Sequence, residues 1–260
     1  MSRATVVHVN TVKLAEDSYT RMMQEKYLAC VVLRMRQIKP FSSNDPLSLL
    51  KRKLHFSSVL RQIKKKDEFP YKVGFIGAGN MAKAIGFSSL DSGLLTPSQM
   101  IVSDPTPSQF EPWKARKVAT TDENVEVVSF ADIILIAAPP QHFDHVISSL
   151  QDPRLSTDHQ KCFVSTLVGK TVRALEEALN SVTGLKVNPQ VIRVTPNTPA
   201  MVGAGCSIMV CDETASYTKP VLQLLKASGS CEIISEEWMN ACSATSGSGP
   251  AYIYLVFRIE

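Results

Sequence analysis

The sequence lacks any apolar run long enough to cross a membrane as a helix. Such a helix needs about 18 consecutive apolar residues, and the runs Tyr27–Leu33, Ile133–Ala138 and Ala251–Phe257 are all far shorter. Glycine and proline are also few, at 12 and 15 of 260 residues, which excludes collagen-like and low-complexity chains. With 44% hydrophobic and 20% charged residues, the sequence predicts a globular protein with a substantial core and no membrane span.

The cysteines and histidines lack the spacing of a metal site. The six cysteines include no C-x-x-C pair, and no histidine joins them at zinc-finger spacing, so we expect buried thiols in a reducing compartment. His142 and His145 stand three residues apart with only Asp144 nearby, which favours a solvated helix start over a metal site. Nothing resembles an activated serine or cysteine with its base, so no catalytic residue is assigned.

Positive charge is concentrated at the beginning of the chain. Residues 1–70 hold 14 Lys and Arg against 6 Asp and Glu, whereas residues 71–260 hold 14 against 18. Residues 47–66 are basic and amphipathic without an acid, which is typical of organelle transit peptides. We expect residues 1–70 to form a disordered or targeting leader with a mitochondrial destination, a cytoplasmic location being the alternative. No basic face with interleaved aromatics follows, so no nucleic-acid binding is expected.

From Tyr71 onward, apolar strand patterns alternate with helical ones. Residues 131–140 form a nearly continuous apolar run of the kind that a parallel sheet buries on both faces. The segments 162–169, 206–211 and 231–236 also predict strands, and residues 171–182 predict an amphipathic helix. The alternation predicts an α/β fold, a Rossmann-type doubly wound and mainly parallel sheet over residues 71–236.

The pattern G-x-G-x-x-A at Gly77, Gly79 and Ala82 directly follows the first apolar strand. The two glycines permit a tight turn and a close approach of a pyrophosphate, and the helix that follows presents its N-terminus to the phosphates. Asp104 ends the next strand, where a carboxylate accepts hydrogen bonds from a ribose diol and repels a 2′-phosphate. The sequence therefore predicts an NAD(P)H site that leans to NADH. The choice stays open, because Ser103, Thr106 and Ser108 nearby could hold a phosphate.

Four separate segments resemble one family in their order and spacing: VGFIGAGNMA (73–82), AAPP (137–140), VIRVTPNTPAMVGAG (191–205) and SGSGPAY (246–252). The chain resembles pyrroline-5-carboxylate reductases over about residues 72–255. The resemblance implies reduction of 1-pyrroline-5-carboxylate to L-proline, the last step of proline biosynthesis, by a homo-oligomer that uses NAD(P)H. It departs from the family at Pro139, where the family usually has a lysine close to the cofactor.

The resemblance also assigns roles to individual positions. It implies that the cofactor contacts Ile76, Gly77, Ala78, Gly79, Asn80, Met81, Asp104, Thr106, Asn124, Ala137, Ala138, Pro139, Pro140, Thr166, Leu167 and Val168. On the substrate side it places Glu236, Asn197, Ser246, Gly247, Ser248 and Gly249. Residues 246–250 are expected to form a loop of N–H donors that opens the final helix, and no metal is expected.

Members of the family continue past SGSGPAY with a helical region that builds the dimer interface and supplies part of the substrate site. Residues 237–260 correspond only to the start of that α-helical dimerisation domain, and the family's substrate loop would lie beyond Glu260. We therefore expect a C-terminally truncated member with an N-terminal extension, in which most of the interface is missing. Two functions stay open: a pyrroline-5-carboxylate reductase of weak or no activity, or a non-catalytic NAD(H)-binding module that associates with full-length subunits.

Overall fold

The computed structural model describes residues 69–259. The basic leader that the sequence predicts for residues 1–70, with its targeting role, therefore lies almost entirely outside the described residues. Glu260 also lies outside them, and the expectation that the family's substrate loop would follow it stays a prediction. None of the helices in residues 69–259 combines the length and the apolar character needed to span a bilayer.

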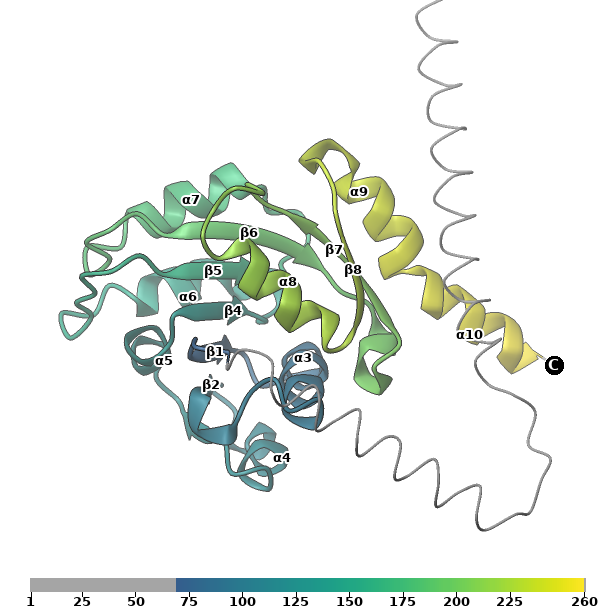
Figure 1. Cartoon of the computed structure of the whole chain (residues 1–260), viewed down its shortest axis with the longest axis horizontal. Helices are drawn as coiled ribbons and strands as arrows, with labels where there is room; N and C mark the ends of the chain where they lie inside the picture. Colours follow the sequence, from purple (N-terminus) through teal and green to yellow (C-terminus); the bar gives the residue numbers. More distant parts are fainter. Residues whose placement is uncertain (1–68, 260) are drawn as a thin grey trace, which may run out of the picture. The chain divides into compact units, whose positions relative to one another are not determined.

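Eight strands form one sheet in the order β3-β2-β1-β4-β5-β6-β7-β8 (Figure 1). All neighbouring strands pair in parallel except β6 and β7, which pair antiparallel. The first six strands follow the Rossmann order, so the predicted doubly wound and mainly parallel sheet is confirmed. The strands are β1 (Val73–Ile76), β2 (Met100–Ser103), β3 (Ala119–Thr121), β4 (Ile133–Ile136), β5 (Cys162–Ser165), β6 (Gln190–Thr195), β7 (Gly205–Val210) and β8 (Gly229–Ile233).

Helices cover both faces of the sheet. Helices α3 and α8 lie on one face, and α5, α6 and α7 lie on the other (Figure 1). The helix α10 follows the sheet at the C-terminal end of the described part (Figure 1). The α-helices are α3 (Asn80–Asp91), α4 (Glu111–Lys114), α5 (Asn124–Phe130), α6 (Phe143–Ser149), α7 (Val172–Asn180), α8 (Thr218–Lys226), α9 (Met239–Cys242) and α10 (Gly249–Ile259).

The central strand β4 shows why the fold needs continuous apolar runs. All four of its residues are buried, but they serve two different cores. Ile133 and Leu135 pack in the core under α3 and α8, whereas Ile134 and Ile136 pack in the core under α5, α6 and α7. Side chains alternate between the faces of a strand, so a strand that is covered on both faces must be apolar throughout.

Several element boundaries differ from the sequence prediction, among them those of the last strand. The strand expected at residues 231–236 begins at Gly229 and ends at Ile233, and Glu236 already opens a helical turn. The strand β3 and the helices α5 and α8 were not predicted at all. β3 is a three-residue edge strand in which Ala119 is exposed, so it carries little of the apolar signal that identifies buried strands.

Trp113 fills the space between helix α3 and the sheet. Its side chain is fully buried and contacts the rings of Phe75 and Phe87, with centroid distances of 5.3 and 4.8 Å. Gly86 makes this possible, because a Cβ at that position would lie 2.6 Å from the Trp113 ring. The indole Nε1 donates a hydrogen bond to the carbonyl oxygen of Ala78 (3.2 Å), in the turn after β1.

We expect Gly86→Ala to lower the free energy of unfolding by about 1–3 kcal/mol, because the added methyl group overpacks a rigid aromatic contact. Urea unfolding followed by circular dichroism measures the change. Gly249→Ala is the matched control, since no atom lies within 4 Å of a Cβ there, and it should be neutral or stabilising by up to about 1 kcal/mol. Equal stability of Gly86→Ala and the wild-type chain would contradict this account of Trp113.

Candidate functional site

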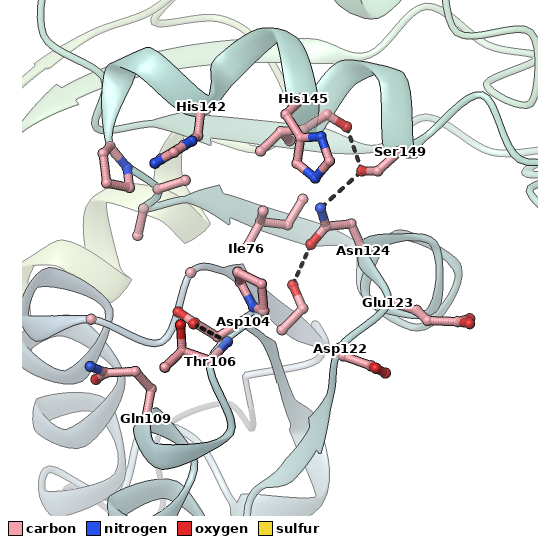
Figure 2. Close-up of a pocket in the computed structure, with 18 of the residues that line it drawn as sticks. Ile76, Asp104, Thr106, Gln109, Asp122, Glu123, Asn124, His142, His145 and Ser149 are labelled. Atoms are coloured by element: carbon pink, nitrogen blue, oxygen red, sulfur yellow. Dashed lines mark hydrogen bonds between the residues drawn. The ribbon is translucent and has the colours of Figure 1, made fainter.

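A cleft of about 740 Å³ lies at the carboxyl ends of β1, β2 and β4. This edge is where doubly wound sheets bind their ligands, at the point where the strand order reverses. Figure 2 shows side chains from the strand ends on one side of the cleft and from α6 on the other. The cleft is lined by Ile76, Gly77, Gly79, Asn80, Ser103, Asp104, Pro105, Thr106, Gln109, Asp122, Glu123, Asn124, Val125, Ala137, Ala138, Pro139, His142, His145, Val146, Ser149, Asp152 and Arg154.

The turn between β1 and α3 is fixed by its neighbours on several sides. Gly77 has a φ of +103°, and a Cβ there would lie 2.9 Å from the Ala137 backbone, so only glycine fits without strain. The N–H of Gly77 donates to the Ser103 carbonyl (2.8 Å), and the N–H of Ala78 donates to Asp104 Oδ2 (2.8 Å). The Ala78 carbonyl accepts from Trp113. The turn is therefore held in one position before any ligand binds.

Helix α3 begins at this turn and presents its N-terminus to the cleft. Gly79 is its N-cap residue, no side chain caps the helix, and its first turn contains no acid. No atom lies within 4 Å of the position that a Gly79 Cβ would occupy. The first N–H groups of a helix have no partner within the helix, and its dipole favours an anion. The open space in front of these donors fits the pyrophosphate of NAD(P)H.

Asp104, at the end of β2, uses both carboxylate oxygens within the protein. Oδ2 accepts from Ala78, and Oδ1 accepts from the N–H of Thr106 (2.9 Å). Each carboxylate oxygen has a second lone pair, so Asp104 can hold the turn and still accept from a ribose hydroxyl. Nearby, Lys83 Nζ donates to Gln109 Oε1 (2.8 Å).

Asn124 links three elements at the far side of the cleft. Its Oδ1 accepts from Ser103 Oγ (2.6 Å) and its Nδ2 donates to Ser149 Oγ (2.9 Å), as Figure 2 shows. These bonds tie the start of α5 to β2 and to the end of α6. The side chain therefore shapes the wall where the resemblance places an adenosine contact.

Ten of the sixteen residues assigned to the cofactor line this cleft; Ala78, Met81, Pro140, Thr166, Leu167 and Val168 do not. Ala78 is buried beneath the turn, and Leu167 is only 2% exposed and packs in the core. Thr166 donates through Oγ1 to the Ile136 carbonyl (3.1 Å). Val168 is 66% exposed beyond the end of β5.

Apart from Asp104, the sequence analysis assigned none of the charged groups that line the cleft to cofactor binding. Arg154 forms ion pairs with Glu123 and Asp152, at 2.7 Å each. Hydrogen bonds from Arg154 lower the pKa of Asp152 below its usual value. Asp122 and Glu123 follow β3, the unpredicted strand, so recognising that strand would have placed them at the carboxyl edge of the sheet.

Two buried cysteines of the described part are poor nucleophiles, and the described residues hold no metal-ligating cluster. Burial raises the pKa of the Cys231 thiol to about 12 and also raises that of Cys162, so neither is a nucleophile at neutral pH. Residues 69–259 contain no cluster of three or more metal-ligating side chains. No catalytic residue is assigned from these groups, and Glu260, beyond which the resemblance places the family's substrate loop, is not among the described residues.

On the substrate side, Glu236 forms a pair that the sequence analysis missed. Its Oε1 accepts from Arg193 Nη1 (3.0 Å) and from the N–H of Val172 (2.9 Å), at the start of α7. The Arg193 side chain is 6% exposed, and its Nε has no hydrogen-bond partner. Arg193 and Glu236 are 43 residues apart, and no local pattern signals their contact.

The expected loop at residues 246–250 is wrong, because the segment is helical. A π-helical turn at Ser243–Gly247 joins α9 to α10, and the N–H of Ser248 donates to the Ser243 carbonyl (3.0 Å). Pro250 has no N–H, so it cannot bond the carbonyl four residues earlier, that of Ser246. Asn197 donates to this carbonyl instead through Nδ2 (3.2 Å).

Asn197 is consequently a buried structural link. It is 3% exposed, and its Oδ1 accepts from the N–H of Cys206 (2.9 Å). Ser246 is also buried, and its hydroxyl has no partner. Gly247, Ser248 and Gly249 are partly exposed along the same helical segment. The N–H of Ser248, one of the free donors that the sequence predicted at residues 246–250, is thus used within the helical segment.

Comparisons with known proteins agree with this geometry. The family model described as "NADP oxidoreductase coenzyme F420-dependent" matches residues 72–169. The chain is 34% identical over 191 residues to pyrroline-5-carboxylate reductase 3 of Danio rerio, covering 73% of this chain and 63% of that protein. The chain thus spans slightly less than two thirds of the length of the curated relatives it matches.

Solved structures of pyrroline-5-carboxylate reductases are also similar to this chain. The pyrroline-5-carboxylate reductase of Coxiella burnetii has a TM-score of 0.63 and 28% identity, covering 73% of this chain and 68% of that one. The Plasmodium falciparum pyrroline carboxylate reductase, solved with NADP bound, has a TM-score of 0.61 and 27% identity, covering 74% of this chain and 68% of that one. With its glycine turn, its Rossmann strand order and these matches, the chain belongs to the pyrroline-5-carboxylate reductase family.

Proposed function

We propose that this chain binds NAD(P)H in the described cleft and reduces 1-pyrroline-5-carboxylate to L-proline. The observation that carries the proposal is the preorganised turn at Gly77–Gly79, whose open helix N-terminus fits a pyrophosphate. Relatives that carry the reductase name, and one that was solved with NADP bound, support it.

The residues of this chain have separate tasks in that reaction. When bound, NAD(P)H supplies the hydride that reduces the C=N carbon, while the ring nitrogen takes a proton. The N–H groups at the start of α3 hold the diphosphate. Glu236 Oε2 has no partner among the described residues, and the side chain is 36% exposed, so it is available to a substrate N–H. Arg193 and the Val172 N–H orient that carboxylate through Oε1.

NADH is the cofactor we propose to be preferred. Asp104 lies where a 2′-phosphate would approach the end of β2, and Asp122, Glu123 and Asp152 add negative charge to the same cleft. Arg154, the one arginine or lysine among the residues that line it, is engaged in two ion pairs. The lining therefore offers no unpaired arginine or lysine to a 2′-phosphate.

One observation favours a second function, a non-catalytic NAD(H)-binding module that associates with other subunits. Four consecutive residues of α10, Tyr252 to Leu255, are 46–64% exposed. Exposed apolar surface of this kind marks a protein interface. A second copy of the chain or a full-length subunit would cover it.

The experiment that separates the two functions is oxidation of NADH and NADPH by the purified chain with 1-pyrroline-5-carboxylate, followed at the nicotinamide absorbance band. We expect turnover that requires both substrates. A folded sample that binds NADH without turnover would overturn the reductase proposal and support the module.

Gly79→Asp should separate cofactor binding from folding. Aspartate is a favourable N-cap residue that suits the helix dipole, so the free energy of unfolding should stay constant or rise by up to about 1 kcal/mol. The same carboxylate repels a diphosphate, so NADH affinity should fall at least about tenfold. Fluorescence titration measures the affinity, and Gly79→Asn, which adds similar bulk without charge, is the control. If both variants bind NADH equally, charge at this helix end has no role.

Asp104→Asn should shift the balance between the two cofactors. The amide oxygen still accepts one backbone hydrogen bond, but the negative charge is removed, so the NADPH-to-NADH affinity ratio should rise about tenfold. A general loss of stability would weaken the binding of both cofactors alike, so it leaves the ratio of the two affinities unchanged. Asp144→Asn provides the control, because Asp144 is exposed on α6 and does not line the cleft. An unchanged ratio in Asp104→Asn would contradict the proposed NADH preference.

A further inference from the structure

The cofactor cleft is lined by more carboxylates than basic side chains. Four carboxylates line it, from Asp104, Asp122, Glu123 and Asp152. Arg154 also lines it and is already paired with two of these acids. An anionic ligand must therefore bind against a net negative wall, unless other groups in the cleft supply positive charge.

Two histidines are placed to supply it. His142 and His145 line the cleft and both are exposed. Their spacing of three residues puts them on one face of the helical segment that leads into α6. In Figure 2 both rings point from this segment into the cleft, across from Asp104, Thr106 and Gln109. Neither imidazole has a hydrogen-bond or ion-pair partner in the described part of the chain.

The surroundings of the two histidines contain charges of both signs. Asp144 lies between them on the same segment, and Asp152 and Arg154 follow α6. Asp122 and Glu123 line the cleft from the end of β3, and Asp104 from the end of β2. Lys170 lies 4.9 Å from the centroid of the Phe143 ring, at the start of α6.

Among the types of side chain that line the cleft, imidazole is the one that serves proteins as a proton switch near neutral pH. Protonation of both imidazoles would add two positive charges to a wall whose other charges come from carboxylates and one guanidinium. The effect on a ligand grows with the negative charge that the ligand brings.

We propose that His142 and His145 determine the cofactor selectivity of the cleft and make it depend on pH. This inference rests on the proposed dinucleotide site. With neutral imidazoles, the carboxylates disfavour the extra 2′-phosphate of NADP(H). Protonated imidazoles offset that repulsion, so the phosphate-rich cofactor gains affinity relative to NAD(H) as the pH falls.

The test is equilibrium binding of NAD⁺ and NADP⁺ to the full chain at pH 8.0 and pH 6.0, by isothermal titration calorimetry. For each protein we divide the NADP⁺ dissociation constant by the NAD⁺ dissociation constant at each pH. Between pH 8.0 and pH 6.0, we expect this ratio to fall about tenfold more in the wild-type chain than in the variant His142→Gln/His145→Gln. The 2′-phosphate itself titrates near pH 6. Comparing the two proteins with the same ligands removes that contribution.

His159→Gln is the matched control. His159 is 60% exposed and lies 3.6 Å from Asp132, outside the cleft, so this variant should keep the pH dependence of the wild-type chain.

The inference is overturned if the double variant keeps that dependence, or if His159→Gln loses it. Binding of neither dinucleotide at either pH contradicts the proposed function itself, and with it this inference. Binding at both pH values with a constant ratio contradicts the inference alone.

Discussion

The backbone of Ala78 is held on both sides of its Cα, and the geometry of the cofactor cleft depends on this. Asp104 accepts from the N–H of Ala78, and Trp113 donates to the carbonyl oxygen of the same residue. Asp104 follows strand β2, and Trp113 is the buried residue of the short helix α4, whose other residues are exposed. The turn before α3 therefore takes its position from the sheet and the core together, and the N–H groups of α3 are aimed without help from a ligand.

The region that the resemblance assigns to the substrate is built by the same means, with polar groups linking segments that are far apart in sequence. Pro250 leaves the Ser246 carbonyl without its helical partner, and Asn197 supplies the missing donor. Arg193 and Glu236 join the middle of β6 to the start of the C-terminal helical segment. The buried Asn197 uses both ends of its amide, as a buried polar side chain requires. Arg193 bonds Glu236 through Nη1, and its Nε has no hydrogen-bond partner in the described part of the chain. Each link fixes one helical segment against the sheet.

Sequence reasoning located the elements of the turn correctly because their pattern is local. Gly77 and Gly79 lie between β1 and α3, and Asp104 follows β2, as the adjacent strand, turn and helix start indicate. The contacts of these residues with a cofactor stay a prediction. It failed at β3, whose three residues carry little apolar signal, and so missed the acids that follow that strand. It also took serine, glycine and proline at 246–250 for a loop, although tertiary contact with Asn197 stabilises a π-helical turn there. The pairing of Arg193 with Glu236 depends on the folded topology, which no short motif encodes.

The position of Trp113 beneath the glycine turn has a thermodynamic consequence. Because the indole holds the turn and also fills the core beside Phe75 and Phe87, opening of the α4 region and displacement of the turn are linked events. A ligand that binds only the ordered turn therefore stabilises the packing around Trp113. By reciprocity, intact packing increases the binding free energy of the ligand by the same amount. Cofactor binding would thus raise the fraction of molecules in which this face of the protein is folded.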